Sequence, residues 1–116
     1  MIKVVRYINK DHKIIGFKCK GHAKYAKYGQ DLVCCAVSVL VINTVNSINE
    51  FTDDTFDYKE DEKTGMIHFM INSNLSKESE VLLKSLFLGL EKVQDSYGKK
   101  YIRLETKWFV NYKLIY

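Results

Sequence analysis

The sequence predicts a two-layer α+β fold, with two helices on one face of a mostly antiparallel sheet. Two observations support this fold class. Two apolar segments are long enough to form helices, and each follows a pair of short segments rich in β-forming residues. The predicted element order is therefore ββαββαβ. A chain of 116 residues is also about the size of one domain.

The strands are predicted as two hairpins and one final strand. The first hairpin joins an alternating segment at residues 1–8 to a β-rich segment at residues 13–20, with residues 9–12 as the turn. The second hairpin joins residues 55–60 to residues 66–72 through a polar turn. In both cases polar or glycine-containing residues separate the apolar segments, as expected for turns.

The two helices are predicted from their caps and their apolar residues. Asp31 is predicted to cap the first helix, which covers residues 32–49 and is apolar nearly all round, so it should be largely buried. Ser76 is predicted to cap the second helix, and Gly98 to end it. Leu88 is expected to widen the apolar stripe of this second helix.

The C-terminal part is predicted to contain the last strand, at residues 101–106, followed by a tail. Residues 1–106 are interpreted as a single domain. The tail, residues 107–116, is aromatic and apolar. An extra strand, a partner-binding edge and a cloning or frameshift remnant all remain open for it.

Composition narrows the class of protein. The formal charge is +4 and the lysines are spread along the chain, so a nucleic-acid partner is permitted but not required. No signal peptide is apparent, and the longest apolar stretch, residues 32–42, contains Ser38 and is too short for a bilayer, so no membrane is expected. Three cysteines, two of them adjacent, cannot form an ordinary disulfide framework. These observations favour a reducing interior and a cytoplasmic location.

The most informative segment places a histidine, a glycine-containing loop and a cysteine in sequence. With Asp31 as the cap, Cys34 lies in the first helical turn, where the helix dipole favours an anion. His22 lies upstream, on a loop at residues 20–30 that is long enough to fold back over the helix start. A thiolate with a nearby base is a nucleophile, so we predict a Cys34–His22 dyad.

Other interpretations of these residues stay open on the local pattern alone. A free cysteine is most often a small buried apolar residue, and this applies to Cys34 as well. Ser38 lies four residues after Cys34 and shares its helix face, which indicates a cleft lining, whereas Cys35 faces elsewhere and is interpreted as core. Asp31 is interpreted as a cap rather than as a residue that orients His22. A zinc site is not favoured, because zinc needs three or four spaced ligands.

Glycine is the other residue type of interest in this segment. Gly29 is expected to let the backbone turn into the helix and to leave room for a substrate chain. Gly21 precedes His22 and allows a tight turn there. Gly21, Gly29, Asp31 and Ser38 are therefore candidate supporting or substrate-binding residues.

The motif formed by these residues resembles the ribosomal-processing cysteine protease family of Firmicutes and related bacteria. It consists of Gly21-His22-Ala23, Gly29, Asp31-Leu32-Val33-Cys34 and Ala36-Val37-Ser38. The resemblance covers about residues 1–105, including the length and the element order. Two features depart from the family: Cys35 stands where alanine is common, and the aromatic tail replaces a short acidic one.

The resemblance implies an activity and partners. Members of the family remove a short N-terminal extension from large-subunit ribosomal protein twenty-seven, cutting after a pair of aromatic residues. The nucleophile maps onto Cys34 and the base onto His22, no cofactor is needed, and a homodimer is expected. The resemblance also implies a loop that closes the site, matching residues 20–30.

Two other classes of function are compatible with the sequence. Mild basicity and eight tyrosines permit a non-enzymatic, ribosome- or RNA-associated binding module. A thiol-redox protein that uses Cys34 and Cys35 is disfavoured, because adjacent cysteines strain a disulfide and lack the Cys-x-x-Cys spacing.

Overall fold

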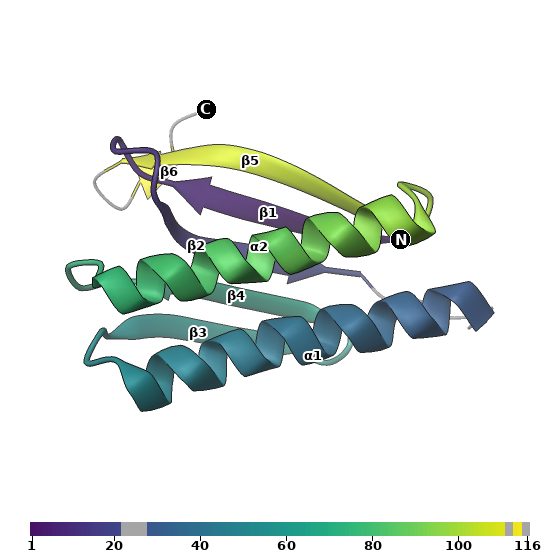
Figure 1. Ribbon diagram of the computed structural model, residues 1–116, viewed down its shortest axis with the longest axis horizontal. Coiled ribbons are helices and arrows are strands. Elements are labelled where there is room, and N and C mark those ends of the chain that lie inside the picture. Colours follow the sequence, from purple (N-terminus) through teal and green to yellow (C-terminus); the bar gives the residue numbers. More distant parts are fainter. Residues whose placement is uncertain (22–27, 111–112, 115–116) are drawn as a thin grey trace.

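The computed structural model describes residues 1–21, 28–110 and 113–114, with the backbone only at 28–31, 110 and 113–114. The elements in order are β1 (Ile2–Ile8), β2 (Ile14–Lys20), α1 (Tyr28–Phe51), β3 (Phe56–Asp61), β4 (Met66–Ile71), α2 (Lys77–Tyr97), β5 (Ile102–Val110) and β6 (Lys113–Leu114). Both helices cover the same face of the sheet (Figure 1). The predicted two-layer α+β fold is confirmed.

The six strands are ordered β3-β4-β2-β1-β5-β6. All neighbouring pairs are antiparallel except β1 and β5, which run parallel, with Ile2 opposite Ile102. A parallel pair needs a crossover connection, and the last crossover before β5 is α2, which lies over the sheet (Figure 1). The first and last parts of the chain therefore meet in the middle of the sheet.

The first hairpin has the predicted turn, and the Asn9 side chain organises it. The Asn9 Oδ1 atom accepts hydrogen bonds from the backbone N–H groups of Asp11 (2.9 Å) and Lys13 (3.0 Å). His12 adopts a left-handed backbone with φ of 61°. Asparagine is favoured in turns because its side chain can bond to nearby backbone in this way.

Helix α1 begins earlier than predicted. It starts at Tyr28, so Asp31 is the fourth helical residue and the prediction of Asp31 as the cap is wrong. The expectation that Gly29 turns the backbone into the helix is also wrong, because Gly29 is already helical. The physical reason is that no proline separates Tyr28 from Asp31, and a single glycine costs a helix only about 1 kcal/mol, so the helix can extend through Gly29.

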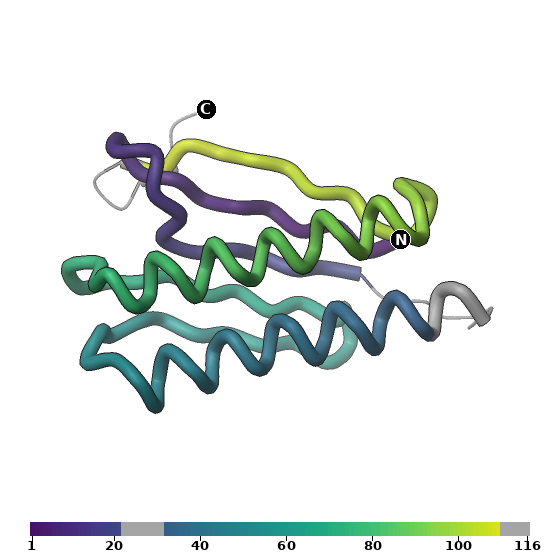
Figure 2. Tube along the Cα trace, in the orientation of Figure 1, coloured from purple at the N-terminus to yellow at the C-terminus, as the bar shows by residue number. Residues whose placement is uncertain are grey.

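Helix α1 is also less buried than predicted. Val33, Val37 and Val41 pack into the core, but Val39 is 63% exposed and Ile42 is 37% exposed on another side. The sheet and α2 cover only part of α1, so its outer side has no partner among the described residues (Figure 2).

The prediction that the apolar segment is too short to cross a bilayer is wrong. The segment Leu32–Phe51 is long and apolar enough to cross a bilayer by length and composition, and a third of its apolar window is buried in the fold. The core helix of a globular protein passes the same test. Here α1 contributes Val33, Val37, Val41 and Ile48 to the central core, which accounts for much of its apolar character.

Helix α2 has the predicted ends. The Ser76 Oγ atom accepts a hydrogen bond from the backbone N–H of Ser79 (3.1 Å), and Gly98 closes the helix with φ of 100°. Its core residues include Leu83, Leu86 and Leu90, whereas Leu88 is 58% exposed. The expectation that Leu88 widens the buried stripe is wrong, because the sheet accommodates a narrower face of the helix.

The last predicted strand continues beyond residue 106, and the tail contains an extra strand. β5 continues to Val110, and β6 folds back onto it, with Phe109 opposite Leu114. Trp108 lies opposite Ile8 and packs edge-on against the His12 ring, with 4.8 Å between ring centroids. Trp108 and Phe109 thus extend the sheet beyond position 106.

Candidate active site

A small cavity of about 110 Å³ lies where α1 meets one end of the sheet. Cys34 and Ser38 from α1 line it, as their shared helix face predicts. The remaining lining residues come from strands, from glycine-containing connections and from the core side of α1: Ile2, Cys19, Gly21, Val37, Val41, Gly65 and Ile67. The cavity therefore combines one half-buried thiol with a hydroxyl and a largely apolar wall.

The two adjacent cysteines have different environments. Cys34 is half-buried and packs against the core, whereas Cys35 is exposed. The prediction that Cys35 belongs to the core is wrong, because the face that it shares with Val39 and Ile42 points away from the sheet. Of these two thiols, only Cys34 lines the cavity.

The helix dipole contributes less at Cys34 than expected. Because α1 starts at Tyr28, Cys34 is its seventh residue rather than a first-turn residue. Its backbone N–H falls within the regular hydrogen-bond pattern, and the effect of the free N–H groups declines beyond the first turn. Activation of the thiol and donors for an oxyanion must therefore come from outside the helix start.

Cys19, to which the sequence pattern assigned no role, lines the same cavity. Burial, together with the neighbouring charge of Cys34, raises the pKa of Cys19 to about 11. Cys19 therefore stays a neutral thiol at neutral pH and is not a nucleophile. Cys19 lies two residues after Phe17 and therefore on the same, inner face of β2. This spacing is the sequence signal that could have identified it.

Gly21 is fixed beside the cavity by its backbone. Its φ is +101°, and a Cβ atom there would overlap the carbonyl oxygen of Met1. Its N–H also donates to the carbonyl of Thr64 (3.2 Å). Only glycine suits both the left-handed backbone and the close approach. The strand end that leads into His22 is therefore held against the first residue of the chain.

Two other predicted site residues, His22 and Asp31, lie wholly or partly outside the described residues. His22 and the loop residues 22–27 lie outside the described residues, so the dyad stays a prediction. Residues 28–30 of the predicted loop are helical. The side chain of Asp31 also lies outside the described part, so any contact of Asp31 with His22 stays untested.

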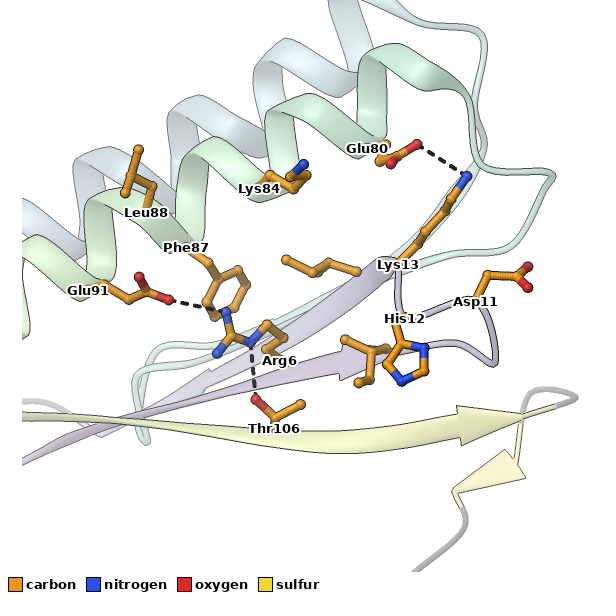
Figure 3. A pocket seen from close by; sticks show the side chains of 12 residues that line it. Arg6, Asp11, His12, Lys13, Glu80, Lys84, Phe87, Leu88, Glu91 and Thr106 are labelled. Atoms are coloured by element: carbon orange, nitrogen blue, oxygen red, sulfur yellow. Dashed lines mark hydrogen bonds and ion pairs between the residues drawn. The ribbon is translucent and has the colours of Figure 1, made fainter.

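A larger cavity of about 540 Å³ lies elsewhere, between α2 and the β1–β2 hairpin. Figure 3 shows Arg6 at its floor, bonded to Glu91 (3.4 Å) and Thr106 (3.1 Å), with Lys13 paired to Glu80 (3.4 Å) at its rim. It contains none of the predicted site residues, and its charges are largely paired. Size alone therefore does not make it the active site, and the smaller cavity that holds Cys34 remains the candidate.

Comparison with known sequences identifies relatives along most of the chain. The profile of the family described as "Cysteine protease Prp" matches residues 1–103. The Ribosomal processing cysteine protease Prp of Bacillus subtilis is 30% identical over 112 residues, which cover 91% of this chain and 97% of that protein. The Staphylococcus aureus protein of the same name is 28% identical over 107 residues, covering 92% of this chain and 100% of that protein.

Two solved structures of a Staphylococcus aureus ribosomal processing protease Prp have the same fold. In the complex with a substrate peptide, that chain matches with a TM-score of 0.85 and 27% identity, over 92% of this chain and 100% of that chain. In the complex with a covalently linked product peptide, the TM-score is 0.83 at 28% identity, with the same coverage. The relatives are thus cysteine proteases that bind peptides.

Proposed function

Since this chain belongs to the cysteine protease Prp family and is a cysteine protease, we propose that it processes a ribosomal protein through Cys34 and His22. The substrate is the N-terminal extension of large-subunit ribosomal protein twenty-seven, cut after a pair of aromatic residues. This role places the protein in the cytoplasm. The proposal rests on one observation: of the two cysteines in α1, Cys34 lines a cavity. Gly21, the residue before His22, lines the same cavity.

The proposed chemistry is acyl transfer from the peptide to Cys34. His22 takes the proton of the Cys34 thiol as the sulfur attacks the carbonyl carbon, and then gives that proton to the leaving amine. The peptide bond breaks, and the N-terminal fragment stays bound to sulfur as a thioester. Water then attacks the thioester with His22 as the base, which releases a carboxylic acid and restores the thiol. No cofactor is required.

The exposed neighbour of Cys34 offers a matched control for this proposal. A peptide that contains the extension is incubated with the wild type and with Cys34→Ala, His22→Ala and Cys35→Ala, and the products are measured by mass spectrometry. We expect cleavage after the aromatic pair by the wild type and by Cys35→Ala. Loss of either dyad residue should reduce the rate by several orders of magnitude. A wild type that leaves the peptide intact under reducing conditions would contradict the proposal.

We also propose that the protein is a homodimer that uses the outer side of α1. Leu32, Cys35, Val39 and Ile42 are exposed there, and their spacing of three or four residues forms one stripe along the helix. Such a stripe can pack against the same stripe of a second copy, because a two-fold interface is self-complementary.

Substitution within the stripe tests the dimer. Val39→Glu should shift the molar mass from dimer to monomer in light scattering after size exclusion, because a carboxylate would be buried in the interface. Leu88→Glu is the matched control, since Leu88 is similarly exposed but lies on α2. A wild type that is monomeric at high protein concentration would contradict this proposal.

A further inference from the structure

The sheet face that carries no helix has a strongly basic surface. This face lies behind the strands in Figure 1, and strand register assigns to it every second residue of each strand. Six of its side chains are cationic, namely Lys3, Lys18, Lys20, Lys59, Arg103 and Lys107. Among the described residues of this face, three are acidic, namely Asp57, Asp61 and Glu105.

The cations lie in rows across neighbouring strands. Lys3 on β1 stands directly opposite Lys20 on β2 and Arg103 on β5, and all three side chains are exposed. Neighbouring strands are about 4.8 Å apart, and like charges directly opposite each other destabilise a sheet. None of the three takes part in an ion pair among the described residues. This row of like charges therefore does not stabilise the fold. A bound anion that covered the row would offset the repulsion between its charges.

A second row lies two residues further along the strands. His68 on β4 stands between Lys18 and Lys59. Burial and then the positive charges of Lys18 and Lys59 lower the pKa of His68, against an opposing effect of Asp57. The positive potential therefore extends over the middle of the face. The half-buried ring of His68 also packs edge-on against Tyr7, with 6.0 Å between centroids.

We propose that this face binds RNA, with the two rows of cations contacting successive phosphates. Lysine and arginine rows that neutralise phosphates supply most of the affinity for nucleic acid, and partly exposed rings such as His68 and Phe109 can stack on bases. A second copy of this chain is a poor occupant, because a two-fold contact would place cations against cations. A membrane is also a poor occupant, since exposed large apolar side chains are absent from the described part of this face.

The RNA-binding face adjoins the candidate active site. Ile2 and Cys19 line the cavity that holds Cys34, and the residues that follow them in the chain, Lys3 and Lys20, belong to the first cation row on the opposite face. A bound RNA would therefore lie across one layer of the sheet from the cavity. The binding surface does not depend on the proposed dyad, and its test uses no protease activity.

The test compares two charge-matched variants in fluorescence anisotropy with a labelled oligouridine of about 16 nucleotides. The face variant carries Lys3→Gln, Lys20→Gln and Arg103→Gln. The control variant carries Lys77→Gln, Lys84→Gln and Lys92→Gln on α2, where all three lysines are exposed. Both variants lose three positive charges, so a difference between them reports the location of binding rather than net charge.

We expect the wild type to bind the RNA with an affinity that falls steeply between about 50 and 200 mM salt. The face variant should bind about tenfold or more weakly, and its slope of log affinity against log salt should be smaller by about 2. The control variant should stay close to the wild type. Equal weakening of both variants, or no binding by the wild type at about 50 mM salt, would overturn the proposal.

Competition separates RNA from other anionic partners. Polyglutamate of equal charge should displace the RNA poorly, and so should vesicles of phosphatidylcholine and phosphatidylglycerol. Displacement by either at the same charge concentration would assign the face to acidic peptides or to lipid and overturn the RNA proposal. If the face variant does not fold, acetylation of the wild type provides the test. RNA should then protect Lys3 and Lys20 but not Lys84 and Lys92, and equal protection would contradict the proposal.

Discussion

At the scale of single residues, the candidate site depends on which side of α1 meets the sheet. Cys34 and Cys35 are neighbours, but helical geometry separates their side chains by about 100° around the axis. The result is a half-buried thiol on the cavity and an exposed thiol on the outer side. Cys19 adds a third thiol, which lines the cavity but is kept neutral by its raised pKa.

The three thiols should react with iodoacetamide at different rates in the folded protein. We expect almost no labelling of Cys19, because burial both shields it and raises its pKa to about 11. Cys34 should be labelled fast as the proposed nucleophile, and Cys35 should be labelled fast in the monomeric Val39→Glu variant, in which the α1 stripe is uncovered. Peptide mass spectrometry after short labelling times measures the order. All three should react in guanidinium. Labelling of folded Cys19 as fast as Cys35 would contradict its burial.

Gly21 and Gly98 allow a matched test of the backbone next to the site. Both have φ near +100°, but a Cβ atom at Gly21 would overlap the Met1 carbonyl, whereas nothing lies within 4 Å of one at Gly98. Alanine at either position should cost about 1–3 kcal/mol of backbone strain. Gly21→Ala should lower the free energy of unfolding in urea further than Gly98→Ala. Equal losses would show that the contact with Met1 is unimportant.

The sequence predicts some residue-level features of the site and not others. The shared face of Cys34 and Ser38 follows from helical spacing alone, and the structure confirms it. The exposure of Cys35 does not follow from spacing, because α1 is apolar on most sides and the pattern cannot tell which side is covered. Cys19 is missed because its role depends on the pairing of β2 with β1 and β4, a long-range contact.

At the scale of elements, side-chain hydrogen bonds hold the start of α2. Ser76 accepts from the Ser79 N–H and donates through its hydroxyl to Asp54 (2.7 Å), and its own backbone N–H donates to the same carboxylate (3.0 Å). Desolvation opposes ionisation of Asp54, but hydrogen bonds from the side chain of Ser79 and from the backbone and side chain of Ser76 lower its pKa below the ordinary value.

Removal of this cap should destabilise the whole protein. We expect Ser76→Ala to lower the free energy of unfolding by about 1 kcal/mol or more, because both the capping bond and the bond to Asp54 are lost. Ser85→Ala is the matched control, since Ser85 is exposed within the same helix. Alanine there should be neutral or slightly stabilising. Urea unfolding compares the two variants, and equal effects would contradict the role of the cap.

The elements themselves are largely predictable from local signals. Ser76 and Gly98 mark both ends of α2 because their preferences are local. The start of α1 is mispredicted, because Asp31 is a good cap that also fits within a first turn. The continuation of β5 to Val110 is not predicted, because it depends on pairing with β1, 100 residues earlier, as far as Trp108 and on pairing with β6 at Phe109 and Val110.

At the scale of the whole molecule, two helices cover one face of a six-stranded sheet and leave three kinds of surface. The outer side of α1 is apolar, the far sheet face is basic, and the gap between α2 and the β1–β2 hairpin forms the large cavity. The Cys34 cavity shares no lining residue with the proposed dimer stripe or with the proposed RNA surface, so the three use different residues of the protein.

The parallel pair of β1 and β5 should be necessary for the fold. A chain that ends at Tyr101 lacks β5 and with it Ile102, which is completely buried. We expect no cooperative thermal transition in the circular dichroism of this chain, because β1 becomes an unpaired edge above an incomplete core. A chain that ends at Val110 retains β5 and is the control. A cooperative transition in the shorter chain would show that β5 is dispensable.

The same pairing has a consequence for synthesis of the protein on the ribosome. Translation produces β1 about 100 residues before β5, yet the two strands are neighbours in the sheet. The nascent chain therefore carries an open edge at β1 until β5 has emerged. Its long-range pairing makes folding a late and comparatively slow event. The sheet should thus be completed only after β5 has emerged from the ribosome, and activity should follow that step.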